Sequence, residues 1–303
     1  MNHKTSSVPV PHGRRDGAIV VALFLLPALA FIVVFIVWPI LSSVRLSFYE
    51  WNGITASSRF AGLGNWRALL TDDVFGRALV NNLVVVGLSI AVQMPIAMAL
   101  AVMIHRGGRA LKLFKVVYFF PMLMSTVAIG VLFKSVYDVN FGAVTPLARA
   151  LGVDALARDW LGDPEIALLS VVAVICWQFI PFYMILFLAR LVSIPDELRD
   201  AAAMDGATGA QCFWRVELPL LRGILVTAMT LSLIGSMKYF DLIWVMTEGG
   251  PSHATELMAT YMYKQAFASY RMGYGSTIAS AMFAIVMIAA LTTMAAGHRR
   301  AEA

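Results

Sequence analysis

Long apolar segments alternate with short polar ones along this chain. Six apolar segments run over residues 18–41, 78–104, 116–133, 166–189, 223–246 and 272–297. Only the fifth contains charged residues, Lys238 and Asp241. A helix that crosses a bilayer needs about 20 apolar residues, and lipid requires every backbone hydrogen bond to be made inside the protein. The pattern therefore predicts an all-α polytopic membrane protein with six transmembrane helices.

The composition agrees with this prediction and excludes several other classes of protein. Hydrophobic residues make up 60% of the chain and charged residues 14%, whereas an average soluble domain has about a quarter charged residues. The two cysteines predict no disulfide framework, and the five histidines show no metal-ligand spacing. The net charge of +5 comes without a basic cluster interleaved with aromatic residues, so we expect no nucleic-acid partner.

The distribution of basic residues predicts the orientation in the membrane. Lysine and arginine are dense in both tails and in the short loop after the second span, which carries Arg106, Arg109, Lys112 and Lys115. Short basic loops remain in the cytoplasm. We therefore expect both termini to be cytoplasmic, with tails at residues 1–17 and 298–303 on either side of a membrane domain at residues 18–297.

The first span has some features of a signal peptide. A basic leader precedes it, and Ala28-Leu29-Ala30 resembles a cleavage site. The apolar run continues past this point and is longer than the core of a signal peptide. We therefore expect the first span to be retained as a membrane helix.

A polar segment at residues 194–219 separates the fourth and fifth spans. It gathers acidic residues, which are scarce elsewhere. Pro195 followed by acidic residues is typical of a helix start, and Gly206 allows the left-handed conformation that ends a helix. A second short helix is predicted over residues 208–216. The segment should form two short helices at an angle outside the membrane, and we call it the knob.

The knob carries a recognisable motif. Asp200-Ala201-Ala202 is followed by Gly206, then Val216, and finally Leu218-Pro219. This order resembles the EAA loop of permease subunits in binding-protein-dependent ABC importers, with Asp200 in place of the usual Glu. The flanking residues 205–207 and 213–215, and the Gly249-Gly250-Pro251 turn after the fifth span, resemble the carbohydrate-uptake branch, which includes the maltose and glycerol-phosphate importer permeases.

The resemblance implies an assembly and a location. It implies a pore formed with a second, different permease, two copies of a cytoplasmic ATPase and an external solute-binding protein that delivers a sugar, an oligosaccharide or a related polyol. ATP with magnesium would be used by the ATPase, so this chain would bind no cofactor and have no catalytic residues. The complex would lie in a bacterial inner membrane.

The resemblance also implies which residues of the knob act on the ATPase. A helix of the knob would dock in a groove of the ATPase, and small alanine side chains would permit close approach. The expected coupling residues are Asp200, Ala201, Ala202, Asp205, Gly206, Leu218 and Pro219. Asp205 has a simpler alternative role as the cap of the second helix, and we expect Phe213 and Trp214 to pack the knob onto the membrane helices.

Candidate substrate-path residues come from the fourth and fifth spans. In the fourth span, Pro181 removes a backbone hydrogen bond near Trp177, Gln178 and Tyr183. In the fifth, Lys238 and Asp241 are three residues apart and are predicted to share a helix face; Trp244 follows them. Sugars commonly stack on aromatic rings and bind to amide and charged groups. The alternatives are lipid contact or packing for the aromatic residues and snorkelling for Lys238.

Two other classes of function remain to be weighed. A secondary transporter or channel driven by an ion gradient would need intramembrane acids or matching broken helices in two halves of the chain. Asp241 is the only acidic residue in the six spans, and no internal repeat is visible. A membrane enzyme would need a nucleophile and base or a metal site, and the sequence shows neither. The particular sugar or polyol is not determined, and Lys238 leaves a phosphorylated polyol open.

Overall fold

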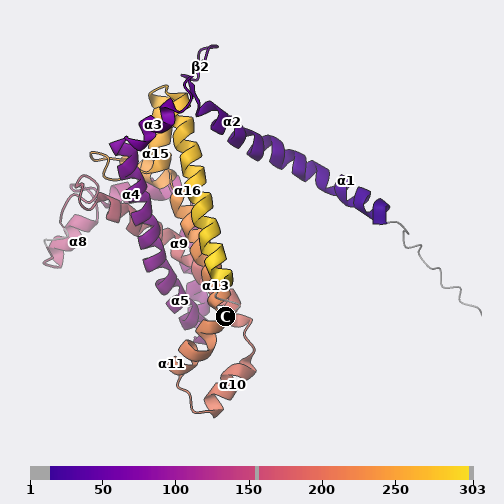
Figure 1. The fold of residues 1–303 in the computed structure, drawn as a ribbon. Helices are drawn as coiled ribbons and strands as arrows, with labels where there is room; N and C mark the ends of the chain where they lie inside the picture. The colour runs from indigo at the N-terminus through magenta and orange to yellow at the C-terminus, as the bar shows by residue number, and fades with distance from the viewer. Residues whose placement is uncertain (1–13, 154–156, 300–303) are drawn as a thin grey trace, which may run out of the picture.

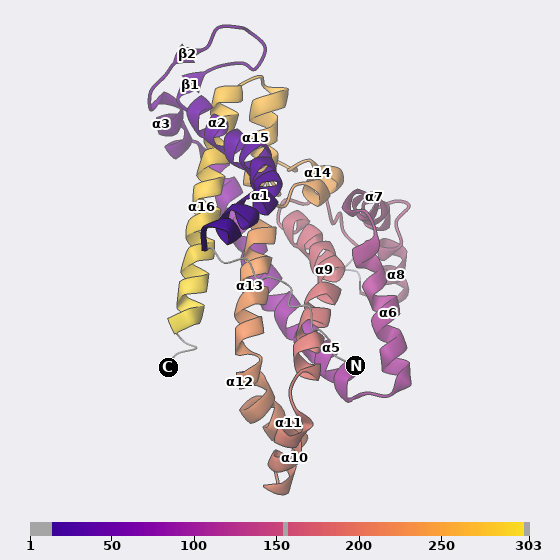
Figure 2. The ribbon, with the colours of Figure 1, turned by 90° about the vertical axis from the view of Figure 1, so that its right-hand side faces the viewer.

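A computed structural model describes residues 14–153 and 157–299. It shows an elongated bundle of helices with one long helical arm standing away from it (Figure 1). The knob lies at one end of the bundle, and the small β hairpin lies at the other with short helices around it (Figure 2). Residues 1–13 and 300–303 of the predicted tails lie outside the described residues.

The helices and strands follow in chain order, with π-helical turns marked η. The first half contains α1 (Arg14–Ile32), η1 (Val33–Val37), α2 (Trp38–Leu46), β1 (Tyr49–Glu50), β2 (Arg59–Phe60), α3 (Gly64–Leu70), α4 (Asp73–Leu88), η2 (Ser89–Gln93), α5 (Met94–Arg106), α6 (Arg109–Leu123), α7 (Thr126–Val136) and α8 (Val144–Ala150). The second half contains α9 (Ala167–Val192), α10 (Asp196–Met204), α11 (Gly209–Cys212), η4 (Phe213–Glu217), α12 (Leu218–Leu220), α13 (Arg222–Met237), α14 (Asp241–Thr247), α15 (Met258–Tyr263), η5 (Lys264–Ala268) and α16 (Met272–Arg299). The two strands pair antiparallel, with Tyr49 opposite Phe60.

Among the described residues, four straight helical segments are long and apolar enough to cross a membrane. They run over Val21–Leu46, Asp73–Arg106, Ala167–Val192 and Met272–Ala295. Two bent helix pairs raise the number of candidate spans to six. The all-α, polytopic prediction is therefore confirmed, while two of the predicted spans differ in detail.

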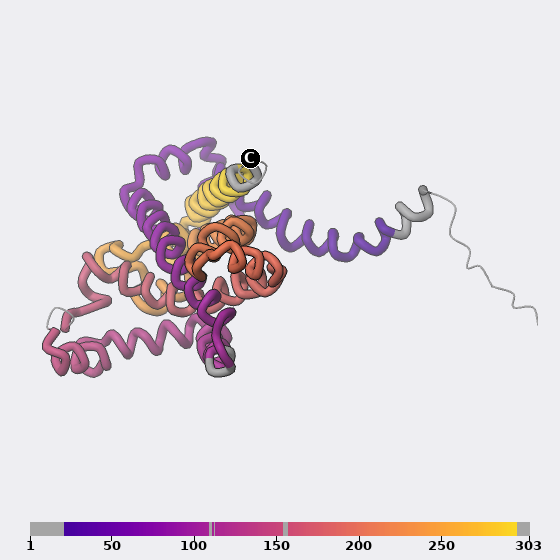
Figure 3. Tube along the Cα trace, turned by 90° about the horizontal axis from the view of Figure 1, so that it is seen from below, coloured from indigo at the N-terminus to yellow at the C-terminus, as the bar shows by residue number. Residues whose placement is uncertain are grey.

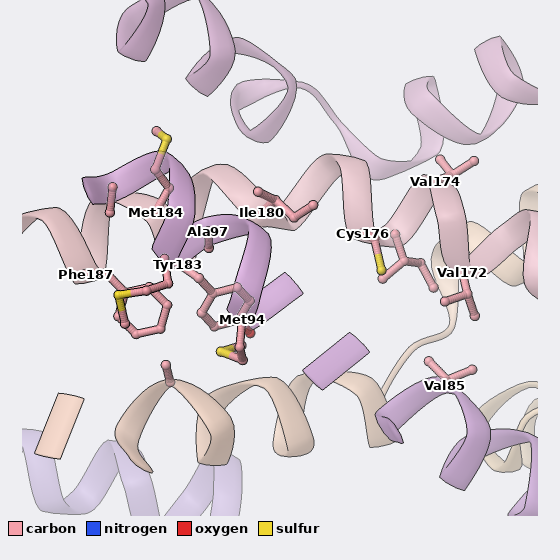
Figure 4. Packing of buried hydrophobic residues seen from close by; sticks show 14 of the residues in the cluster. Val85, Met94, Ala97, Val172, Val174, Cys176, Ile180, Tyr183, Met184 and Phe187 are labelled. Carbon is pink, nitrogen blue, oxygen red and sulfur yellow. The ribbon is translucent and has the colours of Figure 1, made fainter. Parts of the chain in front are cut away.

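The core of the bundle lies where α9 packs against α5. Ala97 and Ala101 of α5 are fully buried, and their small side chains let the two helices approach closely. Figure 4 shows Met94 and Ala97 of α5 beside Ile180 and Tyr183 of α9. Because α9 is apolar around most of its circumference, it can be buried on several sides, as expected for a central helix.

The third predicted span is bent rather than straight. Its two parts, Leu113–Leu123 and Thr126–Val136, meet at 96°. Met124 and Ser125 are in extended conformations between them. Pro121 lies in the last turn before this break and cannot donate a backbone hydrogen bond. The prediction of a continuous helix over residues 116–133 was therefore wrong.

The fifth predicted span is interrupted at residues 238–240. Helix α13 ends at Met237, and α14 begins at Asp241. The buried Asn82 on α4 stabilises the break, since its amide nitrogen donates to the carbonyls of Ser236 and Met237 at 3.3 and 3.4 Å. In a continuous α-helix these carbonyls would accept from residues 240 and 241. Asn82 thus takes over acceptors that the helix would otherwise use.

The break also corrects the predicted relation between Lys238 and Asp241. Lys238 is the cap residue after α13, and Asp241 is the first residue of α14, so the two do not lie one turn apart on the same helix. No ion pair within 4.0 Å joins them in the part of the chain that the structure describes.

The arm formed by α1, η1 and α2 has almost no contact with the rest of the chain over most of its length. None of the residues in its most apolar window is buried. The view from the knob end also shows the arm leaving the bundle sideways (Figure 3). Only the end of α2 returns to the bundle, against α16. A helix with apolar residues around its whole circumference must be covered by lipid or by another protein.

Candidate functional site

The knob has the two-helix structure that the sequence predicts. Helix α10 begins directly after Pro195, and Gly206 has a φ of +77°, in the left-handed region that favours glycine. The second helix is longer than predicted, because α11, η4 and α12 continue from Gly209 to Leu220. A bend of 68° then separates it from the membrane helix α13.

The cap of the second helix is Thr208, so the alternative role for Asp205 was wrong. The Thr208 hydroxyl accepts from the backbone N–H of Gln211, and the Gln211 side chain accepts from the backbone N–H of Thr208. This reciprocal pair is a capping box. Asp205 instead occupies the C-terminal cap position of α10.

Most of the predicted coupling residues face away from the protein. Asp200, Ala201, Asp205, Gly206 and Pro219 are exposed, and Ala202 is partly exposed. Met204, between them, is 88% exposed. Leu218 is the exception, because it packs against the core. The loop between the two helices therefore presents a surface of small, acidic and apolar groups.

The two aromatic residues of the knob behave differently from each other. Phe213 packs against the core of the bundle, as predicted. Trp214 is 65% exposed and touches the edge of the Phe213 ring. The prediction that Trp214 anchors the knob was therefore wrong for the isolated chain, because the side chain lies on the outer side of η4.

A buried carboxylate that the sequence analysis missed holds the knob to the bundle. The side chain of Glu217 is 1% exposed. One of its oxygens accepts from Arg106 at the end of α5 at 2.8 Å, and the other accepts from Arg199 of α10 at 2.8 Å. Arg106 is 111 positions away in sequence, so no local pattern could have indicated the pair.

The two arginines extend this contact to other parts of the knob. The Arg106 guanidinium also donates to the carbonyl of Gly209 at 3.3 Å. Arg199 donates to the Leu191 carbonyl at the end of α9 at 2.9 Å and to Asp196 at 2.7 Å. Although burial opposes the charge, the hydrogen bonds to Glu217 and Asp196 raise the pKa of Arg199. We call Glu217, Arg106 and Arg199 the inner ionic cluster.

Three of the predicted substrate-path residues meet in one pocket beside the break in the fifth span. Tyr183, Lys238 and Asp241 line a pocket of about 400 Å³. Its wall is otherwise mainly aromatic and apolar, with further hydroxyl groups from Thr126, Ser232 and Tyr239. The pocket thus combines aromatic faces, hydroxyl groups and one charge of each sign.

The other three predicted path residues lie elsewhere. Gln178 is 2% exposed, and its amide nitrogen donates to the Thr126 hydroxyl at 3.3 Å, behind the pocket wall. Trp177 packs edge-on against Phe133 and lines a separate apolar pocket. Trp244 stacks on Phe240. The structure therefore does not bring these three residues to the pocket of Tyr183.

The opposite end of the protein has its own ordered loop. After α14, Gly249, Gly250 and Pro251 form the tight turn that the sequence predicts. The side chain of Glu256 is fully buried beneath it and accepts hydrogen bonds from Lys264 at 2.6 Å and from Thr260 at 2.7 Å. His253 lies 3.0 Å from the same carboxylate. We call Glu256, Lys264, His253 and Thr260 the outer cluster.

A second carboxylate joins three helices near the outer cluster. Asp72 accepts from the backbone of Val74 and Phe75 at the start of α4 and from the hydroxyl groups of Tyr261 and Tyr274. Burial alone would raise the pKa of Asp72, but these four hydrogen bonds outweigh it and lower the pKa below its usual value.

The charged clusters in the described part of the chain are structural rather than metal-binding in their composition. No group of three or more His, Cys, Asp or Glu side chains is arranged to hold a metal ion among residues 14–153 and 157–299. The buried glutamates at the two ends are paired with arginine or lysine, and Thr260 adds a hydrogen bond to Glu256.

Comparison with known proteins identifies the family. Residues 93–300 match the family described as "Binding-protein-dependent transport system inner membrane component". The chain belongs to this family. It is therefore a multi-pass inner-membrane permease component of a binding-protein-dependent ABC importer, as the knob motif indicated.

Several curated relatives are similar over almost their whole length. The probable ABC transporter permease protein YurN of Bacillus subtilis is 35% identical over 92% of this chain and 96% of its own. The multiple sugar-binding transport system permease protein MsmF of Streptococcus mutans is 33% identical over 88% and 90%, respectively. The lactose transport system permease protein LacF of Rhizobium radiobacter is 31% identical over 89% and 90%.

The fold of this permease is also found in a solved importer. The crystal structure of a bacterial ABC transporter involved in the import of the acidic polysaccharide alginate matches with a TM-score of 0.79. The match covers 94% of this chain and 96% of that chain at 22% sequence identity. Another structure of the alginate transporter, in complex with an alginate pentasaccharide-bound periplasmic protein, matches with a TM-score of 0.78 at 21% identity.

Proposed function

We propose that this permease forms half of the translocation path for a sugar, an oligosaccharide or a related polyol, and that its knob is the site where a cytoplasmic ATPase drives it. The exposed surface around Asp200, Ala201 and Gly206 carries this proposal. A rigid two-helix unit outside the bundle can move as a body and pull the attached helix α13 with it. In this proposal ATP and magnesium act on the ATPase, and this chain binds neither.

The second half of the path is a different permease subunit. The uncovered arm of α1 and α2 is compatible with this assembly, because a second permease could cover the part of its apolar surface that lipid does not. The named relatives MsmF and LacF belong to sugar transport systems, and the alginate structure with its periplasmic protein supports an external binding protein as the donor. Two copies of the ATPase, one for each permease, complete the complex. Both termini then lie in the cytoplasm with the knob.

The substrate path in this proposal includes the pocket of Tyr183, Lys238 and Asp241. Its aromatic rings offer faces for the C–H surface of a sugar, and its hydroxyl and charged groups can exchange hydrogen bonds with sugar hydroxyls. The interruption of the fifth span leaves irregular backbone beside the pocket, where a polar path through a membrane protein can expose it.

A substitution at the bend of the knob tests the ATPase contact. Proline at position 206 cannot adopt the φ of +77° that Gly206 has, so Gly206→Pro should change the angle between the two helices. We expect at least a tenfold fall in ATP-driven uptake, with normal insertion into the membrane. Weakening the contact with the ATPase by only about 1.4 kcal/mol lowers its binding constant tenfold. Gly206→Asn is the matched control, because asparagine tolerates the left-handed conformation.

Charge reversal provides an independent test of the same surface. The double variant Asp200→Lys with Asp205→Lys leaves the bend unchanged but alters the exposed charge, and we expect it to uncouple uptake from ATP hydrolysis. Cross-linking of Ala201→Cys to the ATPase would locate the contact directly. Normal ATP-driven uptake in the Gly206→Pro and charge-reversed variants, or uptake by vesicles that lack the ATPase, would contradict the proposal and favour an ion-driven carrier.

A further inference from the structure

The inner ionic cluster joins parts of the protein that the chain itself does not connect. The knob is continuous with α9 at one end and with α13 at the other. Helix α5 has no such continuity with the knob, because its chain neighbours are η2 and α6. Its polar connection is Arg106, which contacts both Glu217 and the Gly209 carbonyl.

We propose that Arg106 and Glu217 are positioning residues that make α5 move with the knob, so that force applied to the knob reaches α5, α9 and α13 together. This inference rests on the proposed function, since it assumes that the ATPase moves the knob.

The contacts of Glu217 join the knob to another membrane helix. Arg199 belongs to the knob itself and pairs with both Glu217 and the exposed Asp196. The second arginine comes from the end of another membrane helix and bonds the other carboxylate oxygen. Removing one partner of a buried pair leaves a poorly solvated charge, which disfavours separation of the pair during movement. The contact is thus suited to remain closed while the knob moves.

The packing of α5 against α9 explains why α5 should move together with the knob. Ala97 and Ala101 of α5 are fully buried in the core that this helix forms with α9. If the knob pulled α9 and α13 while α5 stayed in place, this close-packed contact would have to slide. Protein interiors rearrange between discrete packed states rather than by continuous sliding. Moving α5 with the knob preserves the core.

The test measures whether α5 follows the knob. Spin labels at Met103→Cys on α5 and Arg215→Cys on the knob, both exposed positions, are introduced with Cys212→Ser into the assembled importer. In the otherwise unsubstituted protein we expect the same label distance without nucleotide and with magnesium-ATP and vanadate. In Arg106→Gln, which leaves the Glu217–Arg199 pair intact, we expect the distance to shift when nucleotide is added.

The control is the same substitution at Arg190, another exposed arginine, in the last turn of α9. Among the described residues its guanidinium donates to Ser193 directly after that helix, so Arg190→Gln should leave the label distance unchanged with and without nucleotide. We also expect transport per ATP hydrolysed to fall about fivefold or more in Arg106→Gln, the lower end of typical coupling between sites. Glu217→Gln, of nearly the same volume, should show the same distance shift if the Arg106 variant assembles poorly.

The outcomes separate this inference from the proposed function. An unchanged label distance in Arg106→Gln with nucleotide would overturn the inference even where the ATPase cross-links to the knob. Failure of both variants to assemble would also overturn it, because the cluster would then serve folding rather than transmission. Absence of any ATPase cross-link to Ala201→Cys would instead count against the proposed function.

Discussion

Two buried glutamates at opposite ends of this permease hold loops in different ways. Glu217 contacts side chains from α5 and α10, and its arginine partners reach the end of α9 and the start of α11. The charged and hydroxyl partners of Glu256 come from residues 253 to 264. The inner cluster joins the knob to separate membrane helices, whereas the outer cluster holds together residues of a single segment, 253–264.

In the proposed function, the difference corresponds to two mechanical tasks. In this proposal the knob transmits movement, and the inner cluster joins it by hydrogen bonds to α5 and α9, while α13 continues from it along the chain. We expect the external binding protein to contact the outer loop, and the outer cluster gives this loop a fixed shape through local contacts. Asn81 adds support from α4 by donating to the backbone carbonyl of Glu256 at 2.9 Å. The predictions below test what the outer contacts contribute and whether the two clusters are independent.

Removal of the outer carboxylate should have the largest effect on local stability. Glu256→Ala leaves Lys264 and His253 without their shared acidic partner, and breaking a buried charge pair costs about 3 kcal/mol. We expect faster hydrogen exchange over residues 248–263 and reduced stimulation of the ATPase by the binding protein. The matched control is Glu165→Ala, at an exposed acidic residue outside this cluster.

The same variant tests the independence of the two ends. The label distance between positions 103 and 215 should remain that of the unsubstituted protein in Glu256→Ala, with and without nucleotide. If Glu256→Ala shifts this distance as Arg106→Gln does, the comparison fails, because the outer loop would then also control the knob.

A smaller change at the same place should follow from Gly249→Ala. A Cβ atom at this position would lie 2.7 Å from the Glu256 carboxylate, and Gly249 has a φ of +83°. Strain of this kind costs about 1–3 kcal/mol. Gly152→Ala is a precise control, because Gly152 has a φ of +69° but open space around its Cβ position. The difference in thermal unfolding between the two variants measures the contact with Glu256, and equal shifts would exclude it.

The sequence predicted the features that depend on local residues. The apolar runs located the membrane helices, Pro195 and Gly206 located the first helix of the knob, and the glycines before Pro251 located the outer turn. Each of these signals acts within a few residues of its effect. The spacing of the knob motif also identified the family, although it could not identify the transported molecule.

The features that were missed depend on residues far apart in the chain. The break at Lys238 is stabilised by Asn82 on another helix, which takes the carbonyls of Ser236 and Met237. Residues 236–241 contain no proline or glycine, and Gly235 in the turn before them is a weak signal for a break. Likewise, Glu217 appeared as one more acidic residue of a polar loop until its contact with Arg106 was seen. Pairings of this kind require the three-dimensional structure.

The smallest predicted effect concerns the charge on Asp72, which supports the outer end between α4, α15 and α16. The hydroxyl groups of Tyr261 and Tyr274 donate to the charged Asp72 carboxylate. Asp72→Asn removes this charge, while asparagine can still cap α4. Hydrogen bonds to a charged group are stronger than neutral ones, and we expect a loss of about 1 kcal/mol in the free energy of unfolding at neutral pH. Asp73→Asn, at the exposed neighbouring residue, is the control.

The pH dependence of this effect gives it a distinctive sign. Because the pKa of Asp72 is lowered on folding, its contribution is fully present above the pKa of the unfolded chain, about 4, and is lost as the pH falls through the lower folded value. The difference in unfolding temperature between the unsubstituted protein and Asp72→Asn should therefore be constant from pH 7 to pH 5 and shrink below about pH 4. A difference that instead grew on acidification would mean that Asp72 is held protonated, and this part of the outer end would then not depend on a charged carboxylate as the inner cluster does.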